Sequence, residues 1–144
     1  MIEQAGGVLL DTCAAIWLMN GELSSSALAQ IVAAGSQDAV YVSPISAWEI
    51  GMLARPKPGR GAAPQFLPDP TTWFAMLMAR PGVKPALLTP SIAIDASFLP
   101  GELHSDPADR LIIATSRAMR LPLATGDGKI IAYGRAGHID VIAC

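Results

Sequence analysis

The chain alternates short apolar runs with longer amphipathic stretches, and this alternation predicts most of its secondary structure. Unbroken apolar runs between turn residues are typical of buried strands. Such runs occur at residues 8–10, 39–42, 86–89, 122–125 and 140–143. Apolar positions at helical spacing, with caps and stop signals around them, predict helices. These stretches cover residues 14–19, 24–34, 45–53, 71–79, 91–99, 106–119 and 129–133.

Strands that are apolar throughout and alternate with helices are typical of a parallel sheet with helices on both faces. We therefore predict an α/β fold with a parallel sheet of about four to five strands. Residues 56–70 hold five prolines and predict a loop, because neither flank is long enough to form a domain of its own. A single domain is expected over residues 1–144.

Composition excludes several protein classes. Of the 144 residues, 51% are apolar and 15% are charged, which excludes a disordered tail, a coiled coil and a polybasic nucleic-acid arm. We expect no membrane span and no signal peptide, because no apolar stretch is long enough and the first residues lack a basic region. Two cysteines cannot form a disulfide framework, so a reducing cytoplasm is expected.

Acidic residues fall where the predicted strands end. Asp11 closes the first strand, Asp127 follows the fourth, and Glu49 lies about one helical turn beyond the second. Because the carboxyl ends of parallel strands share one edge of a sheet, these side chains are predicted to project toward one crevice. Asp109 joins them if its helix also starts at that edge. This helix has the clearest start in the chain, with Asp106 as cap and Pro107 at its first position.

Four carboxylates in one crevice require a compensating cation. Two of them about 4 Å apart repel by roughly 4 kcal/mol at an effective dielectric near 20. Oxygen ligands without a histidine or cysteine cluster favour a hard ion such as Mg²⁺ or Mn²⁺. Such a site commonly binds phosphate and activates water for attack on a phosphodiester. Without these four acids, 10 basic and 8 acidic residues remain, which agrees with a polyanionic substrate.

Each acid also has a purely structural interpretation. An aspartate at a strand end is commonly a turn or cap residue, which applies to Asp11 and to Asp127 between two glycines. Asp109 is also explained as a charge that favours the helix dipole, and Asp106 is interpreted as a cap rather than a ligand. Glu49 is the strongest candidate, because it is the single charge on the predicted helix.

Other motif interpretations fail on single residues. A phosphate loop at residues 126–129 requires a serine or threonine where Ile130 stands. No glycine fingerprint follows the first strand, which argues against dinucleotide binding. Cys13 occupies the place of the second aspartate of a phosphoaspartate hydrolase, and we interpret it as a small buried thiol.

The tryptophans and histidines receive structural interpretations. Trp17 and Trp48 are expected in the core rather than as base-stacking platforms, and Trp73 in helix packing. Two histidines are too few for a metal cluster. His104 is expected to cap a helix or contact substrate, and His138 to lie at the surface.

Four sequence blocks then carry a resemblance to a known family. The blocks are Leu9–Thr12, Ser43–Ile50, His104–Thr115 and Leu121–Asp127. In this order and spacing they resemble the PIN-domain nucleases, and the closest branch looks like the VapC-type toxins of bacterial toxin–antitoxin pairs. The resemblance runs from about residue 8 to residue 133.

The resemblance implies a Mg²⁺-dependent endoribonuclease toxin, with RNA as substrate and a cognate antitoxin protein as partner. It implies that the catalytic and metal-binding acids are Asp11, Glu49, Asp109 and Asp127. The last of these matches a position that is aspartate or asparagine in relatives. Small hydroxyl positions that orient carboxylates or water are matched by Thr12, Ser46 and Thr125. Arg110 is expected to touch phosphate or to lie on the helix exterior.

Two positions depart from many close relatives, which carry histidine in place of Cys13 and lysine in place of Leu53. If those residues contact RNA in the relatives, substrate choice is expected to differ here. The loop around Lys57, Gly59 and Arg60 is an alternative source of cationic contacts, with a solvated loop as its plain interpretation.

Two alternative functions stay open at this point. One is a PIN nuclease in RNA maturation, and the other is a PIN-like RNA- or protein-binding module without catalysis. Apolar helix faces at residues 14–19 and 45–53 exceed what one thin layer needs, so a homodimer is also predicted.

Overall fold

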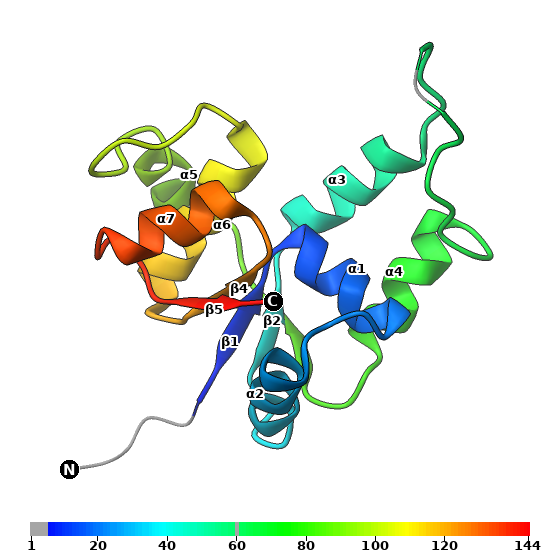
Figure 1. The fold of residues 1–144 in the computed structure, drawn as a ribbon, viewed down its shortest axis with the longest axis horizontal. Helices are drawn as coiled ribbons and strands as arrows, with labels where there is room; N and C mark the ends of the chain where they lie inside the picture. Colours follow the sequence, from blue (N-terminus) through cyan, green and yellow to red (C-terminus); the bar gives the residue numbers. More distant parts are fainter. Residues whose placement is uncertain (1–5, 60) are drawn as a thin grey trace.

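A parallel sheet of five strands forms the centre of the computed structural model, which describes residues 6–59 and 61–144 (Figure 1). The strands are β1 (Val8–Leu10), β2 (Val40–Val42), β3 (Val83–Pro85), β4 (Leu123–Thr125) and β5 (Val141–Ala143). They lie in the order β3-β2-β1-β4-β5, and every neighbouring pair is parallel. This confirms the predicted fold class. The expectations about the first residues and about Arg60 lie outside the described residues.

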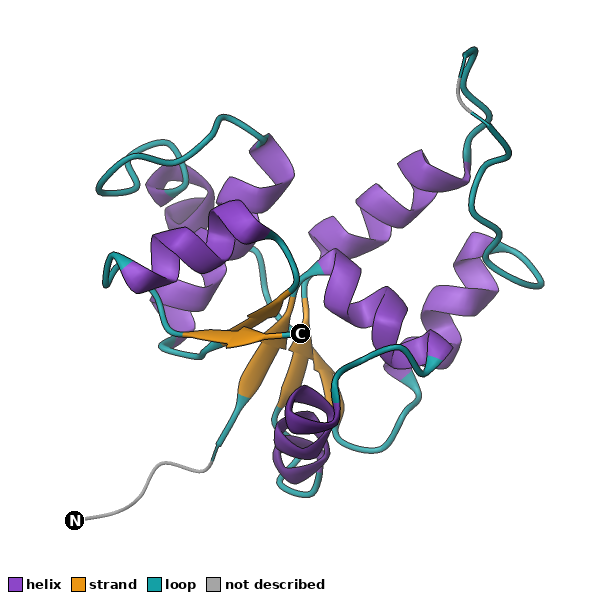
Figure 2. Cartoon of the chain, in the orientation of Figure 1, coloured by secondary structure: helices purple, strands orange, loops and turns teal. Residues whose placement is uncertain are grey.

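Seven helices of the described residues surround the sheet (Figure 2). They are α1 (Thr12–Asn20), α2 (Ser25–Gly35), α3 (Pro44–Ala54), α4 (Pro70–Met78), α5 (Pro90–Asp95), α6 (Pro107–Met119) and α7 (Gly128–Arg135). In the part of the chain that is described, no helix is long and apolar enough to cross a membrane.

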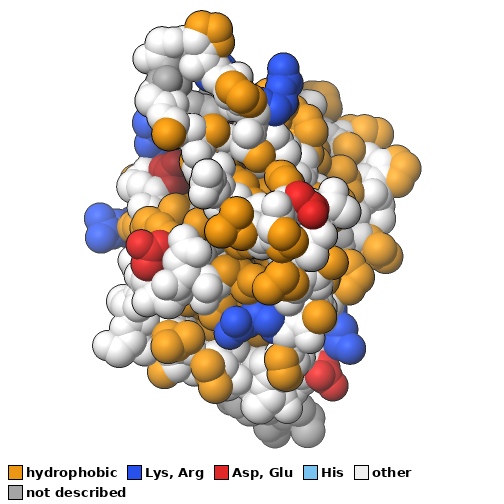
Figure 3. All heavy atoms as spheres, turned by 90° about the vertical axis from the view of Figure 1, so that its right-hand side faces the viewer, with side chains coloured by type: hydrophobic (Ala, Val, Ile, Leu, Met, Phe, Trp, Pro, Cys, Tyr) orange, Lys and Arg blue, Asp and Glu red, His pale blue; other side chains and the backbone are white. Residues whose placement is uncertain are grey.

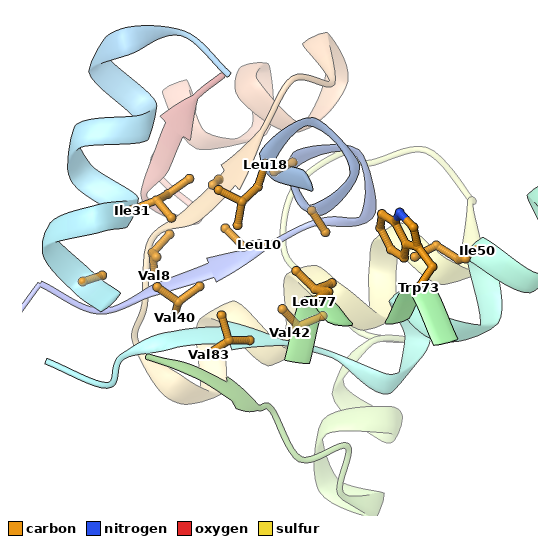
Figure 4. Close-up of a cluster of buried hydrophobic side chains, with 14 of the residues drawn as sticks. Val8, Leu10, Leu18, Ile31, Val40, Val42, Ile50, Trp73, Leu77 and Val83 are labelled. Carbon is orange, nitrogen blue, oxygen red and sulfur yellow. The ribbon is translucent and has the colours of Figure 1, made fainter. Parts of the chain in front are cut away.

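The two faces of the sheet bury separate cores, because successive strand residues point to opposite sides. Val8 and Leu10 of β1 pack with residues of α1, α2 and α4 on one face (Figure 4). Leu9, between them, packs on the other face with Ile112 of α6 and Ile130 of α7. Helices therefore cover both faces, as the apolar strands predict.

The third strand lies earlier than the sequence pattern indicates. It was expected at residues 86–89, but Val83–Pro85 pairs with β2 and residues 86–89 lead into α5. Gly82 explains the shift: it has a φ of +82°, and a Cβ there would lie 2.1 Å from the carbonyl oxygen of Gly35. This close approach turns the chain into the sheet immediately before Val83. A proline at the end of β3 is tolerated because β3 is an edge strand.

The predicted helix at residues 91–99 is also shorter than expected. Thr89, not Ser91, caps α5, with its Oγ1 accepting a hydrogen bond from Ile92 N at 3.2 Å. The helix ends at Asp95 and the chain continues as a turn. The other helices begin and end within two residues of their predicted bounds, which is the usual precision of helix ends.

Candidate active site

A pocket of about 350 Å³ at the carboxyl edge of the sheet brings the four predicted acids together. We call it the acidic pocket, and it is formed where α1 follows β1, where α7 follows β4, along α3 and at the first turn of α6. Its lining residues include Asp11, Glu49, Asp109 and Asp127. The acids that follow the strands therefore lie together at the carboxyl edge of the sheet, as the sequence pattern predicts. Asp109, at the first turn of α6, lies with them.

Two of these acids are held by the starts of helices. Asp11 is the N-cap of α1, and its Oδ1 accepts a hydrogen bond from Ala14 N at 2.7 Å. Asp127 is the N-cap of α7, and its Oδ1 accepts from Lys129 N at 2.7 Å and from Ile130 N at 3.3 Å. The capping interpretation of both residues is thus correct, and they line the acidic pocket as well.

The closest carboxylate group includes a residue that the sequence assigned to capping alone. One oxygen each from Glu49, Asp106 and Asp109 lie within 4.8 Å of one another. Asp106 does cap α6, since its Oδ1 accepts from Asp109 N at 3.0 Å. The same turn that forms the cap places Asp106 beside Glu49 of α3. Asp11 and Asp127 line the acidic pocket beside this group.

Hydroxyl groups hold the carboxylates in place. The Thr12 hydroxyl donates to Glu49 Oε1 and shares a 3.0 Å hydrogen bond with the Ser46 hydroxyl. Thr125 hydrogen-bonds to the Asp11 side chain, and its Oγ1 accepts from Asp127 N at 3.0 Å. All three hydroxyls indicated by the family resemblance therefore contact one of the acids or a residue bound to it.

Burial raises the pKa of the carboxyl groups. Asp11 is 4% exposed, and desolvation raises its pKa from 3.8 to about 6 despite hydrogen bonds from Thr125 and Ala14. Burial likewise raises the pKa of Glu49 and of Asp109, and neighbouring carboxylates add to each shift. The N-termini of the helices at the acidic pocket carry partial positive charge, but this charge is too small to balance the negative charge of the carboxylates. An all-oxygen donor set of this kind fits a hard divalent cation such as Mg²⁺ or Mn²⁺.

His104 has a contact that the sequence did not identify. Its Nε2 lies 2.7 Å from Asp109 Oδ2, while its Nδ1 is buried without a hydrogen-bond partner among the described residues. The imidazole fixes one oxygen of the Asp109 carboxylate and leaves the other for a ligand. A histidine five residues before an acid on a loop has no periodic signal, so only the folded loop shows the pair.

Arg110 does not line the acidic pocket. Its Nε donates to the Ala96 carbonyl at 2.9 Å, and its Nη1 donates to the His104 carbonyl at 3.5 Å. Arg110 follows Asp109 directly, so the helix turns its side chain by about 100° away from that of the acid. The guanidinium therefore braces the loop that carries His104 against the end of α5.

The sequence interpretations of Cys13 and of Trp48 are wrong. Cys13 lines the acidic pocket and is partly exposed rather than buried. Desolvation and the nearby Asp11 charge raise its pKa to about 11, so it is a neutral thiol at physiological pH. Trp48 was expected in the core and is 54% exposed.

The other aromatic residues agree better with their interpretations. Trp73 is buried and packs edge-on against Phe66, with ring centroids 5.0 Å apart. Trp17 is half-buried and lines the acidic pocket, where a Cβ on Gly126 would lie 2.4 Å from its ring. The partly buried ring of His138 packs against Tyr133, with centroids 4.6 Å apart.

Comparison with known proteins gives a consistent result over nearly the whole chain. The PIN domain family matches residues 8–136. Ribonuclease VapC22 of Mycobacterium tuberculosis is 32% identical over 134 residues, which cover 93% of this chain and 97% of the relative.

Two solved structures are similar in fold. The first is VapBC2 from Rickettsia felis bound to a DNA fragment from their promoter, with a TM-score of 0.66, 13% identity, and coverage of 94% of this chain and 97% of that chain. The second is DNA-bound VapBC from Salmonella typhimurium, with a TM-score of 0.65, 15% identity, and coverage of 96% and 98%.

Proposed function

The chain belongs to the PIN domain family, and from this premise we propose that it is a metal-dependent endoribonuclease toxin of the VapC type. The relative over nearly the full length is a ribonuclease by name, and the structural neighbours are VapBC assemblies. The observation that carries the proposal is the meeting of Asp11, Glu49, Asp109 and Asp127 in one pocket. These acids lie on four separate segments of the chain, and a shared ligand explains their meeting.

The side chains of the acidic pocket have distinct tasks in this proposal. The four acids supply oxygen ligands, and Asp106 adds a carboxylate at the rim. A bound Mg²⁺ or Mn²⁺ supplies Lewis-acid activation of water and neutralises charge on the phosphate. Thr12 fixes Glu49 and His104 fixes Asp109, so these carboxylates need little rearrangement when substrate binds.

The alternatives differ from this proposal in what they require of the acids. A binding module without catalysis has no use for one buried and two partly buried carboxyl groups whose pKa values are raised. A nuclease of RNA maturation would use the same pocket, and the reading frame beside its gene distinguishes it from a toxin. A toxin gene lies beside a small antitoxin gene, whereas a maturation gene does not.

The decisive experiment measures cleavage of single-stranded RNA by purified protein with Mg²⁺ or Mn²⁺. Asp11→Asn keeps a capping side chain but loses the charge, so we expect cleavage to fall by about 100-fold or more. Excess EDTA should abolish cleavage, and added Mn²⁺ should restore it. The matched control is Asp69→Asn, the same change at the exposed cap of α4. Full activity in Asp11→Asn, or in EDTA, would contradict the proposal.

We further propose that the chain binds an antitoxin protein, forms a homodimer and acts in the cytoplasm. Of the two apolar faces predicted for a dimer, residues 14–19 are largely used by the core, where Ala14 and Leu18 are buried. The second face, residues 45–53, exposes Trp48 and Met52, and further exposed apolar side chains are Ile94 and Phe98 near the end of α5. Co-purification with the product of the neighbouring reading frame tests the first partner, and light scattering of the isolated chain tests the second.

A further inference from the structure

A second pocket, of about 310 Å³, adjoins the acidic pocket. We call it the Trp48 pocket. Its lining residues come from α3, from the segment 55–57 that follows α3, and from the start of α6. Glu49 and Leu53 line both pockets, and Asp106 of the close carboxylate group lines this one. The Trp48 pocket therefore lies directly beside the site proposed for RNA cleavage.

The main feature of this pocket is an indole that the core does not use. Trp48 is 54% exposed, and Met52, four residues further along α3, is 45% exposed. Residues at this spacing lie on the same face of a helix, so the two side chains form one apolar wall. Pro107 and Ala108, from the first turn of α6, line the pocket as well.

Cations lie at the loop end of the Trp48 pocket. Arg55 and the exposed Lys57 line it there, whereas Glu49 and Asp106 line it toward the acidic pocket. On the side of α3 and α4, hydrophobic side chains are interspersed with basic and acidic ones (Figure 3). A ligand that fits this pocket has an apolar flat part and negative charge beside it.

We propose that the Trp48 pocket is a nucleobase subsite, in which the indole of Trp48 stacks on an unpaired base next to the phosphate at the acidic pocket. The inference rests on the proposed function, because it takes single-stranded RNA as the substrate. Aromatic side chains bind the faces of unpaired bases with little dependence on sequence. Lys57 neutralises the phosphate on the far side of that base, where a flexible ammonium group suffices.

An RNA strand fits these features better than an apolar peptide does. The carboxylates at one end belong to the proposed cleavage site, so a ligand that spans both pockets has a phosphate at that end. The cations at the other end match the next phosphate of the same strand. Leu53 lines both pockets with an apolar side chain, so the cationic contacts to the strand come from the loop after α3.

The test compares Trp48→Ala, Trp48→Phe and Lys57→Ala with the wild-type chain on a single-stranded RNA oligonucleotide of mixed sequence. Loss of stacking is expected to raise KM about tenfold in Trp48→Ala and to leave kcat within about twofold. Trp48→Phe should retain most of the affinity, and Lys57→Ala should raise KM with a weaker salt dependence. Met76→Ala, at an exposed apolar position of α4 outside the pocket, is the matched control.

Three outcomes separate the possible failures. If the wild-type chain cleaves RNA and Trp48→Ala has an unchanged KM, the subsite inference is wrong and the proposed function stands. If the wild-type chain cleaves no RNA with any divalent metal, the proposed function fails and the inference fails with it. The third outcome comes from light scattering: a dimer in the wild type that becomes a monomer in Trp48→Ala assigns the Trp48 surface to a subunit interface and overturns the subsite inference.

Discussion

Asp11 and Asp69 cap α1 and α4 in the same way, each accepting a hydrogen bond from the backbone N–H three residues further on, at 2.7 and 2.8 Å. Their surroundings are opposite. Asp69 is fully exposed, and hydrogen bonds from Thr72 lower its pKa. Asp11 is buried among other acids, and desolvation raises its pKa to about 6. One local sequence signal thus produces two carboxyl groups with opposite pKa shifts.

The difference shows that capping does not explain the burial of Asp11. An exposed aspartate caps α4 with hydrogen bonds that outweigh its small desolvation, so a cap does not need burial. Burial of Asp11 instead costs roughly 3 kcal/mol of folding free energy at neutral pH, from a pKa that rises from 3.8 to about 6. Groups whose pKa is raised by burial and by like charges gather at functional sites. The start of α1 therefore holds a buried acid that the cap does not require, which supports the metal-binding role proposed for Asp11, whereas the start of α4 is a cap only.

The largest effect is expected for the stability of Asp11→Asn without metal. At pH 7.5 this change removes a buried charge and keeps the cap, so the free energy of unfolding should rise by up to roughly 3 kcal/mol. Asp69→Asn should change it little, because its charge is solvated. Urea unfolding in EDTA measures both. A fall in stability for Asp11→Asn would show that capping is the whole task of Asp11.

The pH dependence of stability should separate the same two residues. The folded-state pKa of Asp11 is raised, so the folded chain binds this proton more tightly than the unfolded chain does. Its contribution to stability is therefore full below about pH 4 and is lost as the pH rises to about 6. The lowered pKa of Asp69 gives a contribution of opposite sign, present above its unfolded pKa and lost on acidification.

The measurement is the difference in unfolding free energy between the wild-type chain and each asparagine variant, taken without metal. For Asp11→Asn the slope of this difference should be at most about 1.4 kcal/mol per pH unit between pH 4 and 6. A difference curve that is flat for Asp11→Asn, or that has the same sign for both variants, would contradict the assigned pKa directions.

The smallest expected effect concerns the hydroxyl groups beside two carboxylates. Thr12→Val removes the donor that holds Glu49 and keeps the shape of the side chain, so kcat should fall about tenfold with KM little changed. Thr72→Val is the matched control, because the Thr72 hydroxyl donates to Asp69 Oδ2 at 2.9 Å on the exposed side of α4. Steady-state kinetics on RNA compares them. Equal losses in both variants would indicate general destabilisation rather than positioning.

Local sequence patterns predicted the positions of site residues at strand–helix junctions better than the positions of those in loops. Asp11 and Asp127 each end a strand and start a helix, so their place at one sheet edge follows from the parallel topology. His104 and Asp106 lie at the end of a loop after α5, and their contacts with Asp109 and Glu49 depend on how that loop folds back. No periodicity describes such a segment.

Exposure was predicted less well than element type. The helix at residues 45–53 has only Ser46 and Glu49 as polar side chains, so its pattern does not tell which face is buried. The structure buries Ile50 and exposes Trp48. The third strand was misplaced for a similar reason, because the contact between Gly82 and Gly35 that fixes its start joins positions distant in sequence.

The sequence by itself determined the alternation of strands and helices, the shared edge at which Asp11, Glu49 and Asp127 meet, and the oxygen-only donor set, because these follow from local periodicity, parallel topology and residue type. That Asp109 joins these acids depends on where α6 starts, which the folded chain decided. Only the tertiary structure decided which carboxyl groups are buried, which side chains hold them, and where Trp48 lies. Desolvation and contact distances are properties of packed surfaces, and the packing partners of α3 and of the loop before α6 come from distant parts of the chain.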